Sequence, residues 1–307
     1  MQSTPFVTGY TNPDLDATAC AVAYAEYLTQ SGQEAVAALF GTPHREAQFV
    51  LTYFQIAQPL NAEKVIDEST EVILVDASDT RGISEKINPT QVIELIDHRK
   101  VHEAELFPRA KVQIELVGSA ATLIAEKFAS SNFEISPGSA ALLYSAIISN
   151  TVHFQASVTT ERDKNMAAWL ATKVTIPDGY IKQMFTAKSQ FHKPLKQVIK
   201  DDFATFCFGS CSLGVAQLEI VEVGQLLATR REEIDEVLTH IQAEQGLDHI
   251  FLTAIDLEKA TNTFVVVDAG TQELLERSLQ VVFHDRAAQR PGILMRKTIV
   301  PLIKDSL

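Results

Sequence analysis

The sequence predicts an α/β protein in which a parallel-sheet domain is followed by a smaller α+β domain. Between Phe6 and Val174, short apolar runs alternate with longer segments of helical character, an order of elements that produces a parallel sheet covered by helices. Runs such as Val72–Val75 are apolar at every position, which is typical of strands buried on both faces. A polar, weakly patterned segment follows at 177–194. We therefore expect two domains with the active-site cleft between them.

The elements of the first domain follow from these patterns in order. The expected strands are Phe6–Thr8, Ala35–Phe40, Val72–Val75 and Val92–Ile96. The expected helices are Ala17–Gln30, His44–Phe54, Val117–Ala129, Pro137–Asn150 and Thr159–Val174. Small residues fill the helix at Pro137–Asn150, so we expect it to pack closely against its neighbours.

The second domain is predicted from a different order of elements. We expect a hairpin of strands Phe203–Phe208 and Gly214–Val221, a helix at Arg230–Gln245, strands at His249–Ile255 and Thr263–Val267, a helix at Thr271–Val281 and a final strand at Gly292–Val300. The expected division of the chain is a first domain at 1–186, a linker at 187–194 and a second domain at 195–307.

Acidic residues follow several of the predicted strands. Asp14 and Asp16 come after the first strand, Asp76 directly after Val72–Val75, and Asp97-His98 after Val92–Ile96. The carboxyl ends of parallel strands are where ligands bind in such sheets, and carboxylates are ligands for Mg²⁺ or Mn²⁺. The alternative is that Asp16 caps its helix. Capping explains one such residue but not three strand endings together.

The composition restricts the class of function. The formal net charge of −13 argues against a protein that coats nucleic acid, because phosphate backbones need clustered Lys and Arg. No apolar run approaches the roughly 20 residues of a membrane span. The three cysteines, Cys20, Cys207 and Cys211, are too few for a disulfide framework. We expect free thiols in a reducing cytoplasm.

An ordered series of motifs resembles the DHH phosphoesterase superfamily. The series is Asn12-Pro13-Asp14-x-Asp16, Val75-Asp76, Asp97-His98, Val117-Gly118-Ser119-Ala120-Ala121-Thr122, Ser145-Ala146-Ile147-Ile148-Ser149-Asn150 and, near the end, Met295-Arg296-Lys297. Within the superfamily the sequence is most similar to family II, the manganese-dependent inorganic pyrophosphatases, whose second domain is of the DHHA2 type. The likeness covers essentially the whole chain.

The resemblance implies two divalent cations with an active-site water between them. Mn²⁺ is the expected ion, with Mg²⁺ or Co²⁺ as alternatives. Asp14 matches a ligand of the first cation, Asp16 and His98 match ligands of the second, and Asp76 matches the carboxylate that both share. Asp76 and His98, together with Arg99, are the expected catalytic residues.

The resemblance also implies a set of cations that bind substrate. Arg296 and Lys297 match the residues that hold the phosphates. A further lysine is expected early in the second domain, where Lys193 is the first choice and Lys188 its rival.

Three departures from the family pattern lie in this site. Tyr10 stands where the family has a metal-binding histidine, Arg99 replaces the second histidine of Asp-His-His, and Asn150 replaces an aspartate. A phenol with a pKa near ~10 is a poor ligand, and an amide carries no charge. We expect Tyr10 and Asn150 to be weakened metal ligands, so that at least one of the two sites binds its ion less tightly. His153, three residues after Asn150, is an alternative ligand.

The expected function is therefore metal-dependent hydrolysis of a phosphoanhydride, with pyrophosphate as the substrate. One alternative is an exopolyphosphatase-like or phosphodiesterase-like activity on another small phosphate-containing anion. A second alternative is a catalytically weakened relative that binds a phosphate ligand and regulates. The resemblance is also compatible with a homodimer.

Overall fold

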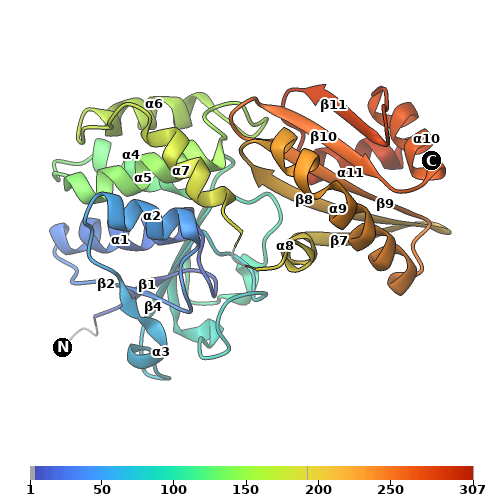
Figure 1. Ribbon diagram of the computed structural model, residues 1–307. Helices are drawn as coiled ribbons and strands as arrows, with labels where there is room; N and C mark the ends of the chain where they lie inside the picture. The colour runs from blue at the N-terminus through green and yellow to red at the C-terminus, as the bar shows by residue number, and fades with distance from the viewer. Residues whose placement is uncertain (1–3, 192, 307) are drawn as a thin grey trace. The chain divides into compact units, whose positions relative to one another are not determined.

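The computed structural model describes residues 4–191 and 193–306 (Figure 1). The chain forms two compact units. The first comprises the residues up to Phe154 together with Val158–Ala187, and the second comprises Gln155–Ser157 together with the residues from Lys188 onward. Each unit has its own sheet. None of the helices in the described part of the chain has the length and hydropathy that a membrane span requires.

The first unit contains a six-stranded parallel sheet with the order β3-β2-β1-β4-β5-β6. Its strands are β1 (Phe6–Thr8), β2 (Val36–Leu39), β3 (Leu60–Asn61), β4 (Val72–Val75), β5 (Val92–Asp97) and β6 (Lys111–Ile114). The predicted strands are confirmed, but β3 and β6 were not expected; they are only two and four residues long. The strand order reverses between β1 and β4, the point at which open α/β sheets place their ligands.

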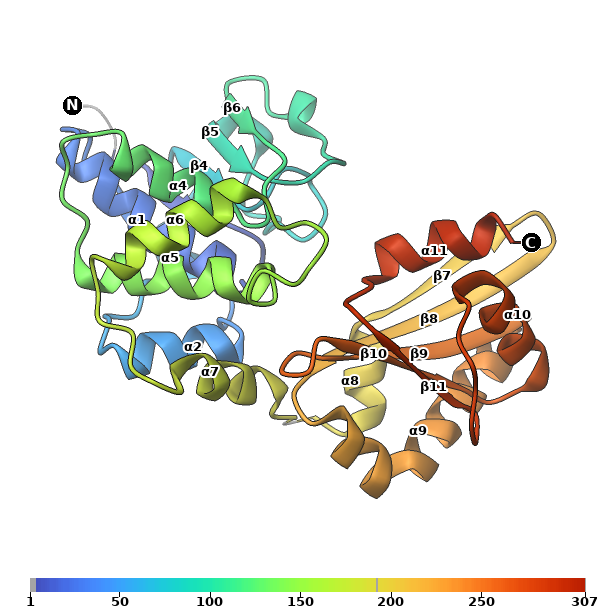
Figure 2. The same ribbon diagram turned by 90° about the horizontal axis from the view of Figure 1, so that it is seen from above.

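Helices cover the sheet of the first unit. They are α1 (Leu15–Gln30), α2 (Arg45–Tyr53), α3 (Ala62–Val65), α4 (Ala120–Ala129), α5 (Pro137–Asn150), α6 (Glu161–Ala171) and α7 (Tyr180–Ser189), with 3-10 turns at Pro89–Gln91 and Ala104–Leu106. Figures 1 and 2 show α1, α4, α5 and α6 gathered together against the sheet, and α1 contacts β1, β2, α4 and α5. Buried alanines along α1 allow these close approaches.

Strand β4 shows why its sequence is apolar throughout. Val72 and Leu74 belong to a core that also contains Leu95 and Phe107, while Ile73 and Val75 are equally buried. Both faces of this strand are therefore covered, as a central parallel strand requires.

The segment 177–194 is weakly patterned in sequence, but much of it is helical. It contains α7, whose Tyr180, Met184 and Phe185 are buried. Tyr180 lies among the rings of Phe49 and Tyr53. A few apolar residues at helical spacing were enough to form this helix within an otherwise polar stretch.

The second unit contains a mixed five-stranded sheet with the order β11-β10-β9-β8-β7. The strands are β7 (Phe203–Phe208), β8 (Cys211–Ile220), β9 (His249–Asp256), β10 (Thr261–Val266) and β11 (Ala287–Pro291), and the helices are α8 (Leu195–Asp201), α9 (Val223–Gln245), α10 (Ala269–Leu279) and α11 (Arg296–Lys304). Only β8 and β9 pair in parallel. The predicted hairpin is confirmed, and α9 starts before the predicted Arg230, where its backbone is kinked.

Both faces of this sheet carry a core. Ala216 and Leu218 of β8 pack into the core that includes α8 and α9, whereas Leu213 and Val215 pack into the core that includes α10 and α11. The alternation follows from the two-residue period of a strand. The expected α+β unit is confirmed.

The predicted strand at Gly292–Val300 is wrong. The last strand is β11, and the chain from Arg296 onward is helix α11. The β-branched run Thr298-Ile299-Val300 favours a strand locally, but Ile299 and Ile303 lie one helical turn apart and both are buried. Burial of this helical face outweighs the local preference.

Candidate metal centre

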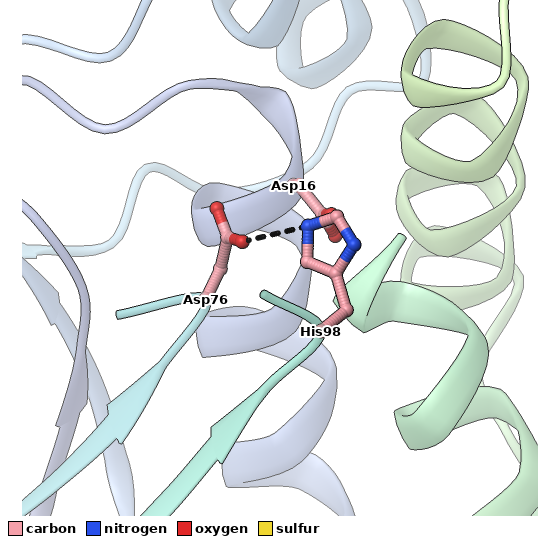
Figure 3. Close-up of side chains that lie close together, drawn as sticks. All are labelled: Asp16, Asp76 and His98. Atoms are coloured by element: carbon pink, nitrogen blue, oxygen red, sulfur yellow. Dashed lines mark ion pairs between the residues drawn. The ribbon is translucent and has the colours of Figure 1, made fainter. Parts of the chain in front are cut away.

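Three side chains converge at the carboxyl ends of neighbouring strands. Asp16 lies in the first turn of α1, Asp76 directly follows β4, and His98 follows β5. Because β1 lies beside β4 and β4 beside β5, the segments that leave these strands meet at one edge of the sheet. One ligand atom from each residue lies within 4.8 Å of the others, and Figure 3 shows the three groups facing one another.

Asp76 occupies a strained and buried position. Its φ of 52° is in the left-handed region, which Asp and Asn tolerate better than most residues. Its Oδ1 is buried and has no hydrogen-bond partner among the described residues, while Nε2 of His98 lies 3.3 Å away. Burial, and then the charges of Asp16 and Asp14, raise the pKa of Asp76 well above its usual range.

His98 is oriented by a backbone carbonyl. Its Nδ1–H donates to the carbonyl oxygen of Val117 across 2.9 Å, which turns Nε2 toward Asp76 and Asp16. A hydrogen bond of this kind fixes the tautomer of a metal-binding histidine. Burial alone would lower the pKa of His98, but the nearby carboxylate of Asp76, and then the charge of Asp16, outweigh this effect and raise the pKa to about 10.

Asp16 is held from the opposite side by helix α4. Its carboxylate accepts hydrogen bonds from the backbone N–H groups of Ala120 and Ala121, each at 2.9 Å, and from Nδ2 of Asn150 at 2.6 Å. Burial raises the pKa of Asp16, against the opposing charge of His98. The capping alternative for Asp16 is wrong, because the cap of α1 is Asp14, which accepts from the N–H of Ala17.

The start of α4 is fixed by a second buried carboxylate. Asp163 accepts hydrogen bonds from the N–H of Gly118 and, at 2.6 Å, from the hydroxyl of Thr122. A Cβ on Gly118 would lie 2.6 Å from Cγ2 of Thr151 and 2.9 Å from Oδ2 of Asp163. Only glycine fits at this point, so Gly118 allows α4 to start where its backbone N–H groups reach Asp16.

Tyr10 and Arg99 lie in contact. The phenol oxygen of Tyr10 accepts from Nη1 of Arg99 at 2.7 Å and donates to Oδ2 of Asp79 at 3.0 Å. The guanidinium carbon of Arg99 lies 4.5 Å from the centre of the Tyr10 ring. His153, the alternative ligand, is not part of the three-residue set found in the described residues.

The proposed phosphate-binding residues of the second unit are arranged around polar partners of their own. The guanidinium of Arg296 pairs with Asp202 at 2.8 Å. Lys297 is exposed, and partial desolvation of its amine lowers its pKa against the opposing charge of Glu219. The same Glu219 lies 3.3 Å from Nζ of Lys188.

Lys193 differs from these residues. Its side chain is 63% exposed and pairs with Asp201. Asp79 and Glu219 were missed by sequence reasoning, since each acts through partners distant in the chain. For Asp79 the available signal was its position in the loop that begins with Asp76.

The donor set fits a divalent cation. Two buried carboxylates and one imidazole with an inward-facing nitrogen are ligands that Mn²⁺ accepts. In the metal-free protein the imidazole of His98, 3.3 Å from the buried Oδ1 of Asp76, supplies the positive charge that this carboxylate needs, and a bound cation would supply it instead.

Comparison with known sequences gives matches for both units. The DHH family, N-terminal domain, matches residues 5–147, and the DHHA2 domain matches residues 182–306. Proteins of Listeria innocua and Brevibacillus brevis, each named a probable manganese-dependent inorganic pyrophosphatase, are both 30% identical to this chain over 303 residues, which is 98% of this chain and 97% of each relative.

A solved structure is also similar over its full length. A protein of Methanococcus jannaschii that has been assigned to the family II inorganic pyrophosphatases has a TM-score of 0.72 and 29% sequence identity, and the match covers 99% of both chains. The likeness in sequence and the likeness in structure therefore both span the two units.

Proposed function

Because the chain belongs to the family II, manganese-dependent inorganic pyrophosphatases of the DHH family, we propose that it hydrolyses inorganic pyrophosphate to phosphate. The observation that supports this proposal is the convergence of Asp16, Asp76 and His98, whose ligand atoms lie within 4.8 Å of one another. Two buried carboxylates beside one imidazole are a donor set that Mn²⁺ accepts.

Asp16, Asp76 and His98 would hold the cation. A bound Mn²⁺ supplies positive charge to the phosphoryl oxygens and lowers the pKa of water. The protein's own part is to keep these ligands oriented: Val117 fixes the tautomer of His98, and the start of α4 fixes Asp16. Asp76 follows β4, which lies in the sheet between β1 and β5, the strands that precede Asp16 and His98. Its loss should weaken the metal centre most.

We propose Arg296, Lys297 and Lys188 as the residues that neutralise the phosphates. Glu219 supports Lys188 over Lys193, because Glu219 forms an ion pair with Lys188 and its charge also acts on Lys297. Lys193 is instead paired on the surface with Asp201. The guanidinium of Arg296 suits bidentate binding of a phosphate.

The family pattern implies two cations, and we propose that the weakened one is the ion that Asp14 and Tyr10 would complete. Asp14 is engaged in capping α1 through Ala17, and the Tyr10 phenol is engaged with Arg99 and Asp79.

We further propose the domain limits 1–186 and 195–307, with a linker at 187–194. For the cellular location we propose a reducing cytoplasm, which the free state of Cys20, Cys207 and Cys211 supports. A homodimer is supported by exposed apolar side chains at the edge of the first sheet, including Val112 and Leu116, which are 45% and 63% exposed. Sedimentation analysis tests the dimer.

The competing function is a regulatory phosphate-binding protein without turnover. Two observations favour this function: Asn150 carries no charge, and the phenol oxygen of Tyr10 is hydrogen-bonded to Arg99 and Asp79. Phosphate release from pyrophosphate, tripolyphosphate and a phosphodiester, measured with Mn²⁺, Co²⁺ and Mg²⁺, separates these functions. We expect release from pyrophosphate with Mn²⁺; binding of pyrophosphate without release under every metal would favour regulation.

A further inference from the structure

The phenol oxygen of Tyr10 is fully engaged. It donates to Asp79 at 3.0 Å and accepts from Nη1 of Arg99 at 2.7 Å and from the backbone N–H of Ser78 at 3.4 Å. A hydroxyl has one hydrogen to donate and two lone pairs, so no lone pair is left for a cation.

The ring of Tyr10 is fixed as firmly as its oxygen. Gly82, with a φ of 89°, passes over the ring so closely that a Cβ there would lie 3.1 Å from Cδ1. The N–H of Thr11 donates to the carbonyl of Gly82, which joins the two loops. Movement of the phenol toward the carboxylates would have to break these contacts together.

Arg99 brings a permanent positive charge to the same place. Its guanidinium stacks on the Tyr10 ring at 4.5 Å and lies 3.9 Å from carboxylate oxygens of both Asp79 and Asp97. Its Nη2 reaches the backbone carbonyl of Asp76 at 3.5 Å. The side chain is still 39% exposed, so part of its guanidinium can donate hydrogen bonds to an anionic oxygen that arrives from solvent.

We infer that the guanidinium of Arg99, held by Tyr10 and Asp79, takes the place of the second cation, so that this site binds a single divalent ion at Asp16, Asp76 and His98. A fixed guanidinium repels a second divalent ion in its neighbourhood, and it is a bidentate partner for a phosphate. The cation count stands on geometry alone; the role of Arg99 toward phosphate rests on the proposed function.

The first test counts the ions. The protein is loaded with Mn²⁺, dialysed, and its metal content is measured beside its Mn²⁺ electron paramagnetic resonance spectrum. We expect one Mn²⁺ per chain with the spectrum of an isolated ion. Two ions per chain with the spectrum of an exchange-coupled pair would overturn the inference. A count of zero would overturn it too, and would also remove the metal centre on which the proposed function stands.

The second test restores the missing ligand. The double variant Tyr10→His with Arg99→His supplies imidazoles and removes the fixed charge, and we expect a second Mn²⁺ per chain. The matched control is Arg109→Gln, which removes an exposed guanidinium paired with Glu71 and should leave the count at one. A folded double variant that still binds only one ion would contradict the assigned role of Tyr10 and Arg99.

The third test separates Arg99 from the metal. We expect Arg99→Gln to keep one Mn²⁺ per chain while the KM for pyrophosphate rises roughly 10- to 100-fold, the loss of a charged hydrogen bond. An unchanged KM in a folded variant would show that the guanidinium does not bind substrate. Loss of the ion in the same variant would place Arg99 in support of the ligands and contradict its role as the second positive charge.

Discussion

The side-chain amide of Asn150 donates a hydrogen bond to the carboxylate of Asp16 across 2.6 Å, joining residues that are 134 positions apart. Asp16 is fully buried, so this neutral donor stabilises a carboxylate that would otherwise depend more heavily on a cation. An aspartate at position 150 would reverse the interaction, because two carboxylates would then face each other.

Asn150→Asp should therefore lower the stability of the metal-free protein and increase the stabilisation that Mn²⁺ gives. The free energy of unfolding without metal should fall by about 1–3 kcal/mol at neutral pH, through the lost hydrogen bond and the new repulsion. The rise in Tm on adding Mn²⁺ should exceed that of the wild type, since binding to the folded state alone stabilises it. Calorimetry with chelator and with Mn²⁺ measures both. The control Asn61→Asp replaces an exposed helix cap with an equally good one. If Mn²⁺ raises the Tm of Asn150→Asp no more than it raises that of the wild type, the placement of Asn150 beside the metal centre is contradicted.

Gly118→Ala tests whether the start of α4 positions the metal ligand. The new methyl group would meet Thr151 and Asp163 at less than 3.0 Å, so we expect a loss of about 1–3 kcal/mol in stability, as for other overpacked sites, together with weaker Mn²⁺ binding. Gly224→Ala is the matched control, because nothing lies near its Cβ position and its backbone is helical; it should be neutral or slightly stabilising. Equal effects of the two substitutions would show that the packing around Gly118 is unimportant.

The two lysine candidates differ in their partners, and a pair of variants distinguishes them. Lys188→Gln should raise the KM for pyrophosphate by about tenfold, a charged interaction of roughly 1.4 kcal/mol. Lys193→Gln should leave KM nearly unchanged, because its side chain pairs with Asp201 on the surface and exposed pairs contribute little. The opposite ranking would assign the role to Lys193 and separate Lys188 from the substrate.

The raised pKa of His98 gives the metal-free protein a dependence on pH. The folded pKa of about 10 lies above the ordinary value of 6.5, so the charged imidazole contributes stability that is fully present below pH ~6.5 and is lost as the pH rises toward 10. Urea unfolding with chelator should show a decline of up to a few kcal/mol across this range, at roughly 1.4 kcal/mol per unit of pKa shift. His98→Gln should flatten the decline, and an equally steep decline in that variant would assign it to other groups.

Much of the fold could be predicted because local patterns and topology agree. The apolar strand Val72–Val75 and the carboxylate that follows it indicated both a central parallel strand and a ligand position. The structure has that strand and places Asp76 in a group of three residues that could hold a metal ion. The final helix was misread because Thr298-Ile299-Val300 favours a strand locally, while the decisive contact, burial of Ile299 with Ile303, depends on the finished core.

The substituted part of the site could be located but not understood from sequence. The positions of Tyr10 and Arg99 were recognisable as departures, yet their contact joins residues 89 positions apart and depends on Asp79 and on the turn at Gly82. No local pattern encodes such a contact. That Asp14 rather than Asp16 caps α1 was similarly out of reach, because either aspartate could have capped the helix.

Comparing the wild type with Asp76→Asn under Mn²⁺ tests the central claim most directly. Asparagine tolerates the left-handed backbone of this position, so the variant should fold while losing the anionic ligand that faces His98. The account predicts Mn²⁺-dependent release of phosphate from pyrophosphate by the wild type, abolished by a chelator and lost in folded Asp76→Asn together with Mn²⁺ binding. Undiminished Mn²⁺-dependent release by the folded variant would contradict it, because hydrolysis would then not depend on the cluster of Asp16, Asp76 and His98.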